Sequence, residues 1–386
     1  MRPIALFFFL FPILFIGQNH NQELNDIVAF ESSIAEKKID FKASMSTANY
    51  DLKYHKLEFE LDPSSSFIEG EITSHYVPNE DIAQIVFDLT DNMEVSGVYH
   101  LYSGAALDFT QNSDDELIID LLQTQAAGVK DSLKVVYSGN PISSGFGSYE
   151  QDYHDGAPII WTLSEPYGSR TWWPCKDDPS DKADSADIVI IVPSEQIAVS
   201  NGVLVEEIDM GDGRKKYHWS ERYPICTYLV SITTYPYTVW YDQYIGLNGD
   251  TLPLEYYVYP DHYDIVYDNY LLTNDMMEVF AEKFGEYPFM GEKYGHAEFG
   301  RGGGMEHQTI TSMGGYSQWL IAHELGHQWW GDLITCASFH HIWLNEGFAR
   351  FSEALWEEAY NGVDAYKNYW LNHAYYGEGT VYVEEP

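Results

Sequence analysis

Residues 323–327 read His-Glu-Leu-Gly-His, and Glu346 follows His327 by 19 residues, in the stretch Trp-Leu-Asn-Glu-Gly. Helical residues four positions apart lie on one face about one turn from each other, so the imidazoles of His323 and His327 can converge on one ion. Glu324 then lies beside that ion, where its carboxylate can take a proton from a zinc-bound water and pass it to a leaving amine. The pattern predicts a hydrolytic zinc site, and the alternative is an amphipathic helix that carries two surface histidines.

The third ligand of such a site has to come from farther along the chain. A metzincin would have glycine and a third histidine where this chain has Trp330 and Leu333, which excludes that class. Glu346 begins a second helical pattern with one apolar face. The residues that mark this face are Phe348, Phe351, Leu355 and Ala359. Two packed helices would place His323, His327 and Glu346 around one zinc ion per chain and leave a fourth position open for water.

Other polar residues near this pattern are weaker candidates. His340 and His341 are alternative ligands, but they lie in the connection 331–342 rather than on a helical face, so we interpret them as structural or exposed. Cys336 has no CxxC partner and is not counted as a ligand. Glu353 follows Glu346 by seven residues and is a candidate for orienting a ligand histidine, although we expect a solvated helix carboxylate there.

Three separated motifs resemble those of the aminopeptidase N family of zinc metallopeptidases, which also includes leukotriene hydrolase. They are the zinc pattern above, the stretch Gly-Gly-Met-Glu-His at 303–307, and Glu-Pro-Tyr-Gly-Ser-Arg-Thr-Trp-Trp-Pro-Cys-Lys-Asp-Asp-Pro at 165–179. The resemblance extends from about Tyr50 to the last residue. One departure is His307, where the family usually has asparagine. The resemblance implies a multidomain fold in which an N-terminal antiparallel β-sheet domain precedes a thermolysin-like α+β catalytic domain.

The glycine-rich stretch before Glu306 has a physical interpretation of its own. Three glycines, 302–304, remove every side chain beside an expected strand, so a substrate backbone can approach and pair along it. Glu306 then ends the groove and can hold the α-ammonium of a peptide with a free N-terminus. The resemblance implies that Glu165 also contacts this amine. The alternative is a flexible loop with a solvated glutamate. The expected substrate-binding residues are Glu165, Gly303, Gly304, Met305 and Glu306.

Composition excludes some classes of partner. Sixty acidic and twenty basic residues give a formal net charge of −40, which argues against binding to nucleic acid or anionic lipid. A hydrophobic content of 45% in 386 residues argues against disorder. The three cysteines are too few for a disulfide framework, so we expect core thiols.

The N-terminus resembles an export signal. Arg2 precedes an apolar run at 4–16, which is shorter than the roughly 18 residues that a membrane span needs. We therefore expect a signal peptide at 1–17, a secreted or periplasmic protein, and no stable membrane span.

Hydrophobic alternation indicates a β-rich first half. Period-two patterns predict strands at 57–61 and 68–76, with further candidates at 188–192 and 228–233. Helical periodicity appears at 275–285, where a glycine and a nearby proline end the pattern. We expect a β-rich domain at 18–245 that packs directly on a catalytic domain at 246–386.

These observations predict a zinc-dependent aminopeptidase in which a zinc-bound water attacks the first peptide carbonyl. The alternatives are an epoxide hydrolase of the leukotriene hydrolase type and a non-catalytic secreted peptide-binding protein. In the family a tyrosine beyond the third ligand stabilises the oxyanion, but Tyr375, Tyr376 and Tyr382 do not match its context. We therefore expect that the catalytic domain is incomplete here and that the chain is a fragment of a longer protein. The sequence leaves the oligomeric state open.

Overall fold

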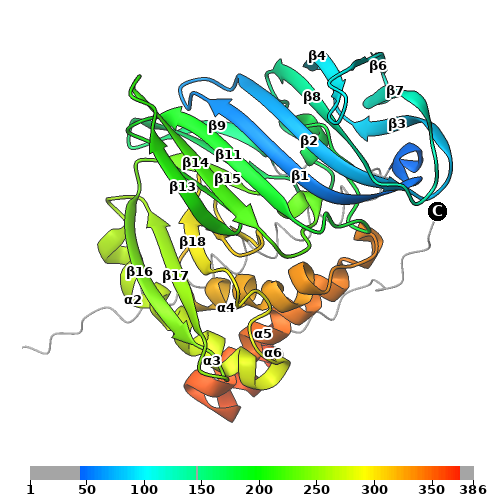
Figure 1. Ribbon diagram of the computed structural model, residues 1–386. Coiled ribbons are helices and arrows are strands. Elements are labelled where there is room, and N and C mark those ends of the chain that lie inside the picture. The colour runs from blue at the N-terminus through cyan, green and yellow to red at the C-terminus, as the bar shows by residue number, and fades with distance from the viewer. Residues whose placement is uncertain (1–43, 145–146, 374–386) are drawn as a thin grey trace, which may run out of the picture.

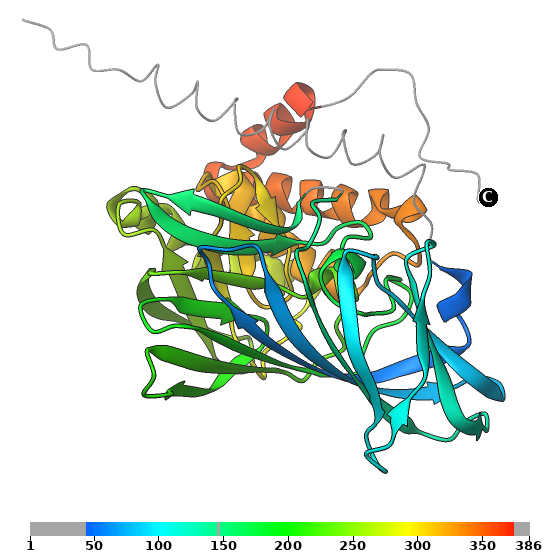
Figure 2. The same ribbon diagram turned by 90° about the horizontal axis from the view of Figure 1, so that it is seen from above.

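The computed structural model describes residues 44–144 and 147–373. The expected signal peptide, 1–17, and the three tyrosines near the end, Tyr375, Tyr376 and Tyr382, lie outside the described residues. Figure 1 shows the β-rich N-terminal part in one half of the molecule and the helices α2–α6 in the other, and the same separation is visible from above in Figure 2.

The described residues of the N-terminal part form three sheets. The largest has the order β13-β14-β11-β1-β2-β8-β4-β5. Its strands are β1 (Tyr50–Leu61), β2 (Ile68–Pro78), β4 (Met93–His100), β5 (Ala106–Leu107), β8 (Asp131–Gly139), β11 (Ala186–Pro193), β13 (Val203–Asp209) and β14 (Arg214–Glu221). A second sheet has the order β12 (Ile197–Ser200), β15 (Ile232–Tyr235), β10 (Ala157–Leu163) and β9 (Ser148–His154). The third consists of β3 (Ile82–Asp88), β7 (Glu116–Gln125) and β6 (Phe109–Gln111).

The alternation in the sequence explains the two central strands. Leu57 and Phe59 of β1 are buried, and Leu57 lies opposite Ile72 of β2 in an antiparallel pair. The predicted antiparallel β-rich domain is therefore confirmed, with one parallel pair, β1 and β11, inside the large sheet. The candidate strand at 228–233 is only partly correct, because a short 3-10 helix, η4 (Thr227–Leu229), precedes β15. Two further 3-10 turns are η2 (Met45–Thr47) and η3 (Ser169–Thr171).

The catalytic part combines a mixed sheet with helices. The sheet order is β16 (Thr238–Ile245), β17 (Thr251–Val258), β18 (Tyr294–Glu298), β20 (Thr311–Met313) and β19 (Gly304–Met305). The helices are α2 (Tyr263–Tyr270), α3 (Leu272–Phe284), α4 (Gln318–His327), α5 (Trp343–Asn361) and α6 (Val363–His373). A π-helical turn, η5 (Gln328–Leu333), and a 3-10 turn, η6 (Phe339–His341), connect α4 to α5. Strands β16 and β17 form an antiparallel hairpin within the catalytic sheet. The expected domain boundary at 245/246 lies between these two strands.

Two of the predicted helices can be compared with the structure. Helix α3 ends as expected, because Gly285 adopts φ 99° at its C-terminus, a conformation that favours glycine. Helix α5 also forms, and the predicted apolar face is partly buried. Leu355 belongs to the hydrophobic core of the catalytic part and Phe351 packs against it, whereas Phe348 is 37% exposed and Ala359 is exposed. The buried face also carries small and polar residues, among them Asn345, Ala349, Ser352 and Glu353.

The two parts share a hydrophobic core. Tyr257, Phe299 and Met305 of the catalytic part belong to the same buried cluster as the β1 and β2 side chains. The expected direct packing of the parts is therefore present. The three cysteines are buried, as expected for core thiols. No described helix combines the length and the apolar character that are needed to cross a bilayer.

Candidate metal and catalytic site

Helix α4 is positioned by its cap and by close packing. The Ser317 hydroxyl accepts a hydrogen bond from the backbone N–H of Leu320 at 3.2 Å, which caps the first turn. A Cβ atom on Gly326 would lie 2.5 Å from Oγ of Ser352, so only glycine lets α4 approach α5 this closely. This approach brings the two histidines of α4 to the first turn of α5.

The predicted ligands His323, His327 and Glu346 form one cluster. The two Nε2 atoms lie 3.1 Å apart, and Oε2 of Glu346 is 3.4 Å from Nε2 of His323 and 3.7 Å from Nε2 of His327. Zinc–nitrogen and zinc–oxygen bonds of about 2.0–2.2 Å separate tetrahedral ligand atoms by roughly 3.4 Å. The three residues therefore fit one zinc ion. His340 and His341 are not part of this cluster.

The other ring nitrogens of the two histidines have partners that set the tautomer. Nδ1 of His323 lies 2.7 Å from Oε1 of Glu353, and Nδ1 of His327 lies 3.2 Å from the carbonyl oxygen of Trp330. With Nδ1–H as donor, each Nε2 keeps a lone pair for a metal. Glu353 is fully buried, so the expectation of a solvated carboxylate there is wrong, because packing of α5 on α4 places it behind the ligand.

Sequence reasoning missed two residues that hold Glu353. Tyr369 of α6 donates a hydrogen bond from its hydroxyl to Oε2 at 2.6 Å, and Arg350 lies 3.3 Å from Oε1. Arg350 is one helical turn before Glu353, a spacing that can be read from the sequence. Tyr369 comes from another helix, and no local pattern indicates it.

The site concentrates negative charge around the histidines. Burial lowers the pKa of His323, but hydrogen bonds with Glu346 and Glu353 raise it overall to about 10. Burial lowers the pKa of His327 too, while the charges of Glu306 and Glu346 raise it well above its usual value. Such a cluster stabilises a cation between its members.

Glu324 lies against the glycine-rich strand. A Cβ atom on Gly304 would lie 2.3 Å from Oε1 and 2.4 Å from Cδ of Glu324, so the carboxylate occupies the space that a side chain would need. Burial raises the pKa of Glu324 to about 8, while His323 and His327 lower it. The environment thus brings the Glu324 pKa near neutrality, as suits a group that accepts and then donates a proton.

Glu306 and its neighbours are buried beside this carboxylate. Gly304 and Met305 form β19 at the edge of the catalytic sheet, paired with β20, and Gly303 precedes them at φ 88°. Glu306 is 4% exposed, and its Oε1 has no hydrogen-bond partner among the described residues. Nδ1 of His307 lies 2.8 Å from Oγ of Ser312, and burial lowers the His307 pKa to about 3. His307 is therefore a neutral, buried side chain that is hydrogen-bonded to β20.

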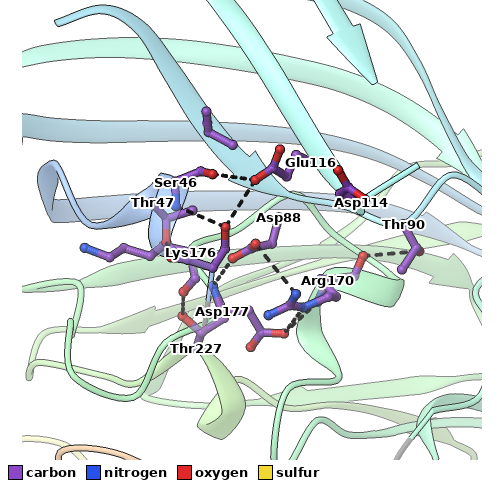
Figure 3. A network of polar contacts seen from close by, with 12 residues as sticks. Ser46, Thr47, Asp88, Thr90, Asp114, Glu116, Arg170, Lys176, Asp177 and Thr227 are labelled. Atoms are coloured by element: carbon purple, nitrogen blue, oxygen red, sulfur yellow. Dashed lines mark hydrogen bonds and ion pairs between the residues drawn. The ribbon is translucent and has the colours of Figure 1, made fainter. Parts of the chain in front are cut away.

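Glu165 follows β10 in the N-terminal part, in a cis peptide with the next proline, and is 2% exposed. The segment after it is held by a buried ionic network (Figure 3). Nε of Arg170 lies 3.1 Å from Oδ2 of Asp177, and the Asp177 N–H donates to Asp88 at 2.9 Å. Asp88 also lies 3.7 Å from the Arg170 guanidinium. This network connects the segment to the end of β3.

Aromatic contacts connect the Glu165 segment to the surroundings of Glu306. The rings of Tyr167 and Tyr228 both pack edge-on against Phe339, at 5.0 and 5.3 Å between centroids. Burial and the charge of Glu306 raise the Tyr228 pKa well above its usual value. The roles of Glu165 and Glu306 as amine-binding residues remain predictions, and these contacts favour them.

One further buried acid near the cluster was missed. Asp332 is fully buried in η5, and neither carboxylate oxygen has a hydrogen-bond partner among the described residues. Burial, followed by the charge of Glu306, raises its pKa well above the usual value. The position of Asp332 depends on the kink of η5 at Trp330 and Gly331, for which the sequence offers no signal beyond the glycine.

Two family models match the chain. The Peptidase M1 N-terminal domain matches residues 47–229, and the Peptidase family M1 domain matches residues 304–379, which together exceed half of the chain. Among individual relatives, glutamyl aminopeptidase from Rattus norvegicus is 28% identical over 270 residues, which are 64% of this chain and 28% of that protein. Aminopeptidase N from Haemonchus contortus is 30% identical over 264 residues, which are 62% of this chain and 26% of that protein.

Solved structures show the same similarity. The M1 zinc metallopeptidase from Deinococcus radiodurans superimposes with a TM-score of 0.75 at 26% identity, over 86% of this chain and 76% of that one. A variant of that enzyme bound to a Tyr-Ser-Ala substrate gives a TM-score of 0.72 at 26% identity, over 83% and 74% of the two chains. The chain spans little more than a quarter of the length of the two relatives named above.

Proposed function

Because the chain belongs to the peptidase M1 family, we propose that it is a zinc-dependent aminopeptidase that removes the first residue of peptides. The observation that carries the proposal is the convergence of His323, His327 and Glu346, with Glu324 next to them and an edge strand alongside. The named relatives are aminopeptidases, and the solved neighbours are zinc metallopeptidases.

His323, His327 and Glu346 would hold the zinc ion. When bound, zinc would supply Lewis-acid chemistry, which polarises the first peptide carbonyl and makes water nucleophilic at neutral pH. Glu353 keeps the His323 ring in place through Nδ1, with Tyr369 and Arg350 behind it. Such supporting carboxylates typically contribute about 10–100-fold in metal affinity.

Glu324 would move the proton. Its carboxylate takes the proton of the attacking water and delivers it to the nitrogen of the leaving peptide, so the bond between the first and second residues breaks. The buried environment supports this role, because it brings the pKa of Glu324 to about 8 and so favours both proton uptake and release.

The backbone of β19 and two carboxylates would orient the substrate. Met305 lies on an edge strand, so a peptide can add alongside it by main-chain hydrogen bonds. Glu306, buried with an unpartnered Oε1, would hold the α-ammonium together with Glu165. A peptide whose amine is acetylated would lose this charge-assisted contact.

The test is a panel of aminoacyl amides and short peptides, each with a free and an N-acetylated form, assayed with the zinc-loaded protein. Release of the first residue from free-amine substrates, with strong discrimination against the acetylated forms, supports the proposal. Binding of peptides without product release would contradict it and would favour a peptide-binding protein. A chelator-treated sample serves as the control.

We also propose that the protein is exported, because of the charged start and apolar run in residues 1–17. The N-terminal sequence of the mature protein tests this. An N-terminus near Gly17 supports export, and an intact Met1 contradicts it.

A further inference from the structure

A second cluster of metal-ligating side chains lies apart from the residues of the first site. His154 is the last residue of β9 in the N-terminal part, whereas Asp261 and His262 lie between β17 and α2 in the catalytic part. One ligand atom from each residue lies within 4.8 Å of the other two. We propose that these three residues bind a second divalent transition-metal ion, zinc or a similar one, which ties the two parts of the protein together.

The ring nitrogens of both histidines face one carboxylate. Nε2 of His154 lies 3.0 Å from Oδ1 of Asp261, and Nε2 of His262 lies 3.9 Å from Oδ2 of the same residue. The two rings stand nearly perpendicular, with centroids 5.2 Å apart. An ion between the three groups would replace one hydrogen bond by three coordinate bonds.

A buried carboxylate orients one of these rings. Nδ1 of His262 lies 2.8 Å from Oε1 of Glu298. Glu298 is 4% exposed, and its Oε2 accepts a hydrogen bond from the backbone N–H of Tyr259. This contact places the proton on Nδ1 and leaves the lone pair on Nε2, as Glu353 does for His323 in the first site. A carboxylate behind a histidine in this way is the usual companion of a metal ligand.

The second ring is held by stacking. His154 lies 3.6 Å from the ring of Tyr259, with an interplanar angle of 10°. Asp261 has no such restraint, because its side chain is 54% exposed. Rotation of this carboxylate can bring its oxygens, which now lie 3.0 and 3.9 Å from the two ring nitrogens, to the roughly 3.4 Å that separates tetrahedral ligands.

The donor set defines the class of ion. Two imidazoles and one carboxylate suit zinc, cobalt, nickel or copper, whereas magnesium and calcium prefer oxygen ligands alone. The side chains of His154 and His262 are 23% and 31% exposed, against 4% for His323, so water can complete the coordination. We expect weaker binding than at the buried first site, because the ligand atoms must move to close on the ion.

A bound ion would have a structural consequence. His154 ends the first strand of the β9–β10 hairpin, and β10 leads within two residues to Glu165. The ion would therefore join this hairpin to the catalytic part and stabilise the folded chain by mass action.

The experiment is a zinc titration of the chelator-treated full chain, with metal content measured after dialysis at graded free zinc. Wild type should bind two ions per chain, one tightly and one at least about tenfold more weakly. His262→Ala and Asp261→Asn should lose only the weaker ion. His100→Ala is the matched control, because His100 forms a similar 2.9 Å pair with Asp131, and among the described residues this pair belongs to no three-residue cluster.

Thermal unfolding provides the second measurement. Zinc in the range of the weaker step should raise the melting temperature of wild type and of His100→Ala, but not of Asp261→Asn. The Asp261 side chain is 54% exposed, so this substitution leaves the core intact. One ion per wild-type chain would overturn the proposal. So would a second ion that persists in both His262→Ala and Asp261→Asn. A His323→Ala variant that keeps only the weaker ion separates this result from any failure of the catalytic assignment.

Discussion

Replacement of Gly304 by alanine should displace the Glu324 carboxylate and reduce turnover. The added Cβ would lie 2.3 Å from Oε1, about 1.1 Å closer than the 3.4 Å at which ordinary contacts begin. Glu324 is 4% exposed, so the surrounding atoms leave no free space for a small shift. The added methyl group would therefore force the carboxylate out of its present position. A displacement of about 1 Å at a catalytic group can cost about 100-fold in rate, or roughly 2.7 kcal/mol of transition-state stabilisation.

The assay is steady-state hydrolysis of an aminoacyl amide by the zinc-loaded protein. Displacement of the proton-transfer group should lower kcat, whereas simple obstruction of the substrate would raise KM. Zinc content and melting temperature should stay close to those of wild type, which shows that the fold and the ligands are intact.

Gly302→Ala is the matched control in the same glycine run. A Cβ on Gly302 would meet nothing within 4 Å, and this residue does not need the positive φ of its neighbour Gly303. The control should keep kcat within about twofold. A Gly304→Ala variant with normal kcat, or a Gly302→Ala variant with an equal loss, would refute the assignment of this space to Glu324.

Three further predictions concern metal binding, substrate recognition and stability. Glu346→Ala should lose the tightly bound zinc ion during dialysis while His340→Ala retains it, and metal analysis that finds equal retention would remove Glu346 from the ligand set. Glu306→Ala should raise KM for free-amine substrates and weaken their advantage over acetylated ones, and unchanged discrimination would show that Glu306 does not bind the amine. Arg170→Ala, which leaves buried carboxylates unpaired, should cost about 3–5 kcal/mol of unfolding free energy in urea. Arg214→Ala, which removes an exposed pair, should change this free energy far less, and equal losses would contradict a structural role for the network in Figure 3.

Local patterns predicted those parts of the site that depend on spacing within one helix. The four-residue separation of His323 and His327 places both on one face of α4, and in the structure their Nε2 atoms lie 3.1 Å apart. The β-rich first half followed from alternation, since a period of two is a direct consequence of strand geometry. The third ligand, Glu346, lies on a second helix, α5. The close approach of α5 to α4 depends on Gly326, and only the packed structure shows why glycine is needed there.

What the sequence could not predict depends on contacts between distant segments. The helical pattern of α5 was correct and its apolar face partly so, but the pattern did not show that the buried face also carries Glu353, which contacts a metal ligand. The second cluster is another example, since 107 residues separate His154 from Asp261. Only the packing of the two parts brings them together.

The central claim is that Glu324 transfers protons beside a zinc ion that it does not bind. Comparison of Glu324→Gln with wild type, at matched zinc content, tests it most directly. We predict unchanged zinc stoichiometry and a loss of about 10²- to 10⁴-fold in kcat for an aminoacyl amide, the usual contribution of a general acid and base. Near-normal turnover by the Glu324→Gln variant, or loss of its tightly bound zinc, would contradict the account.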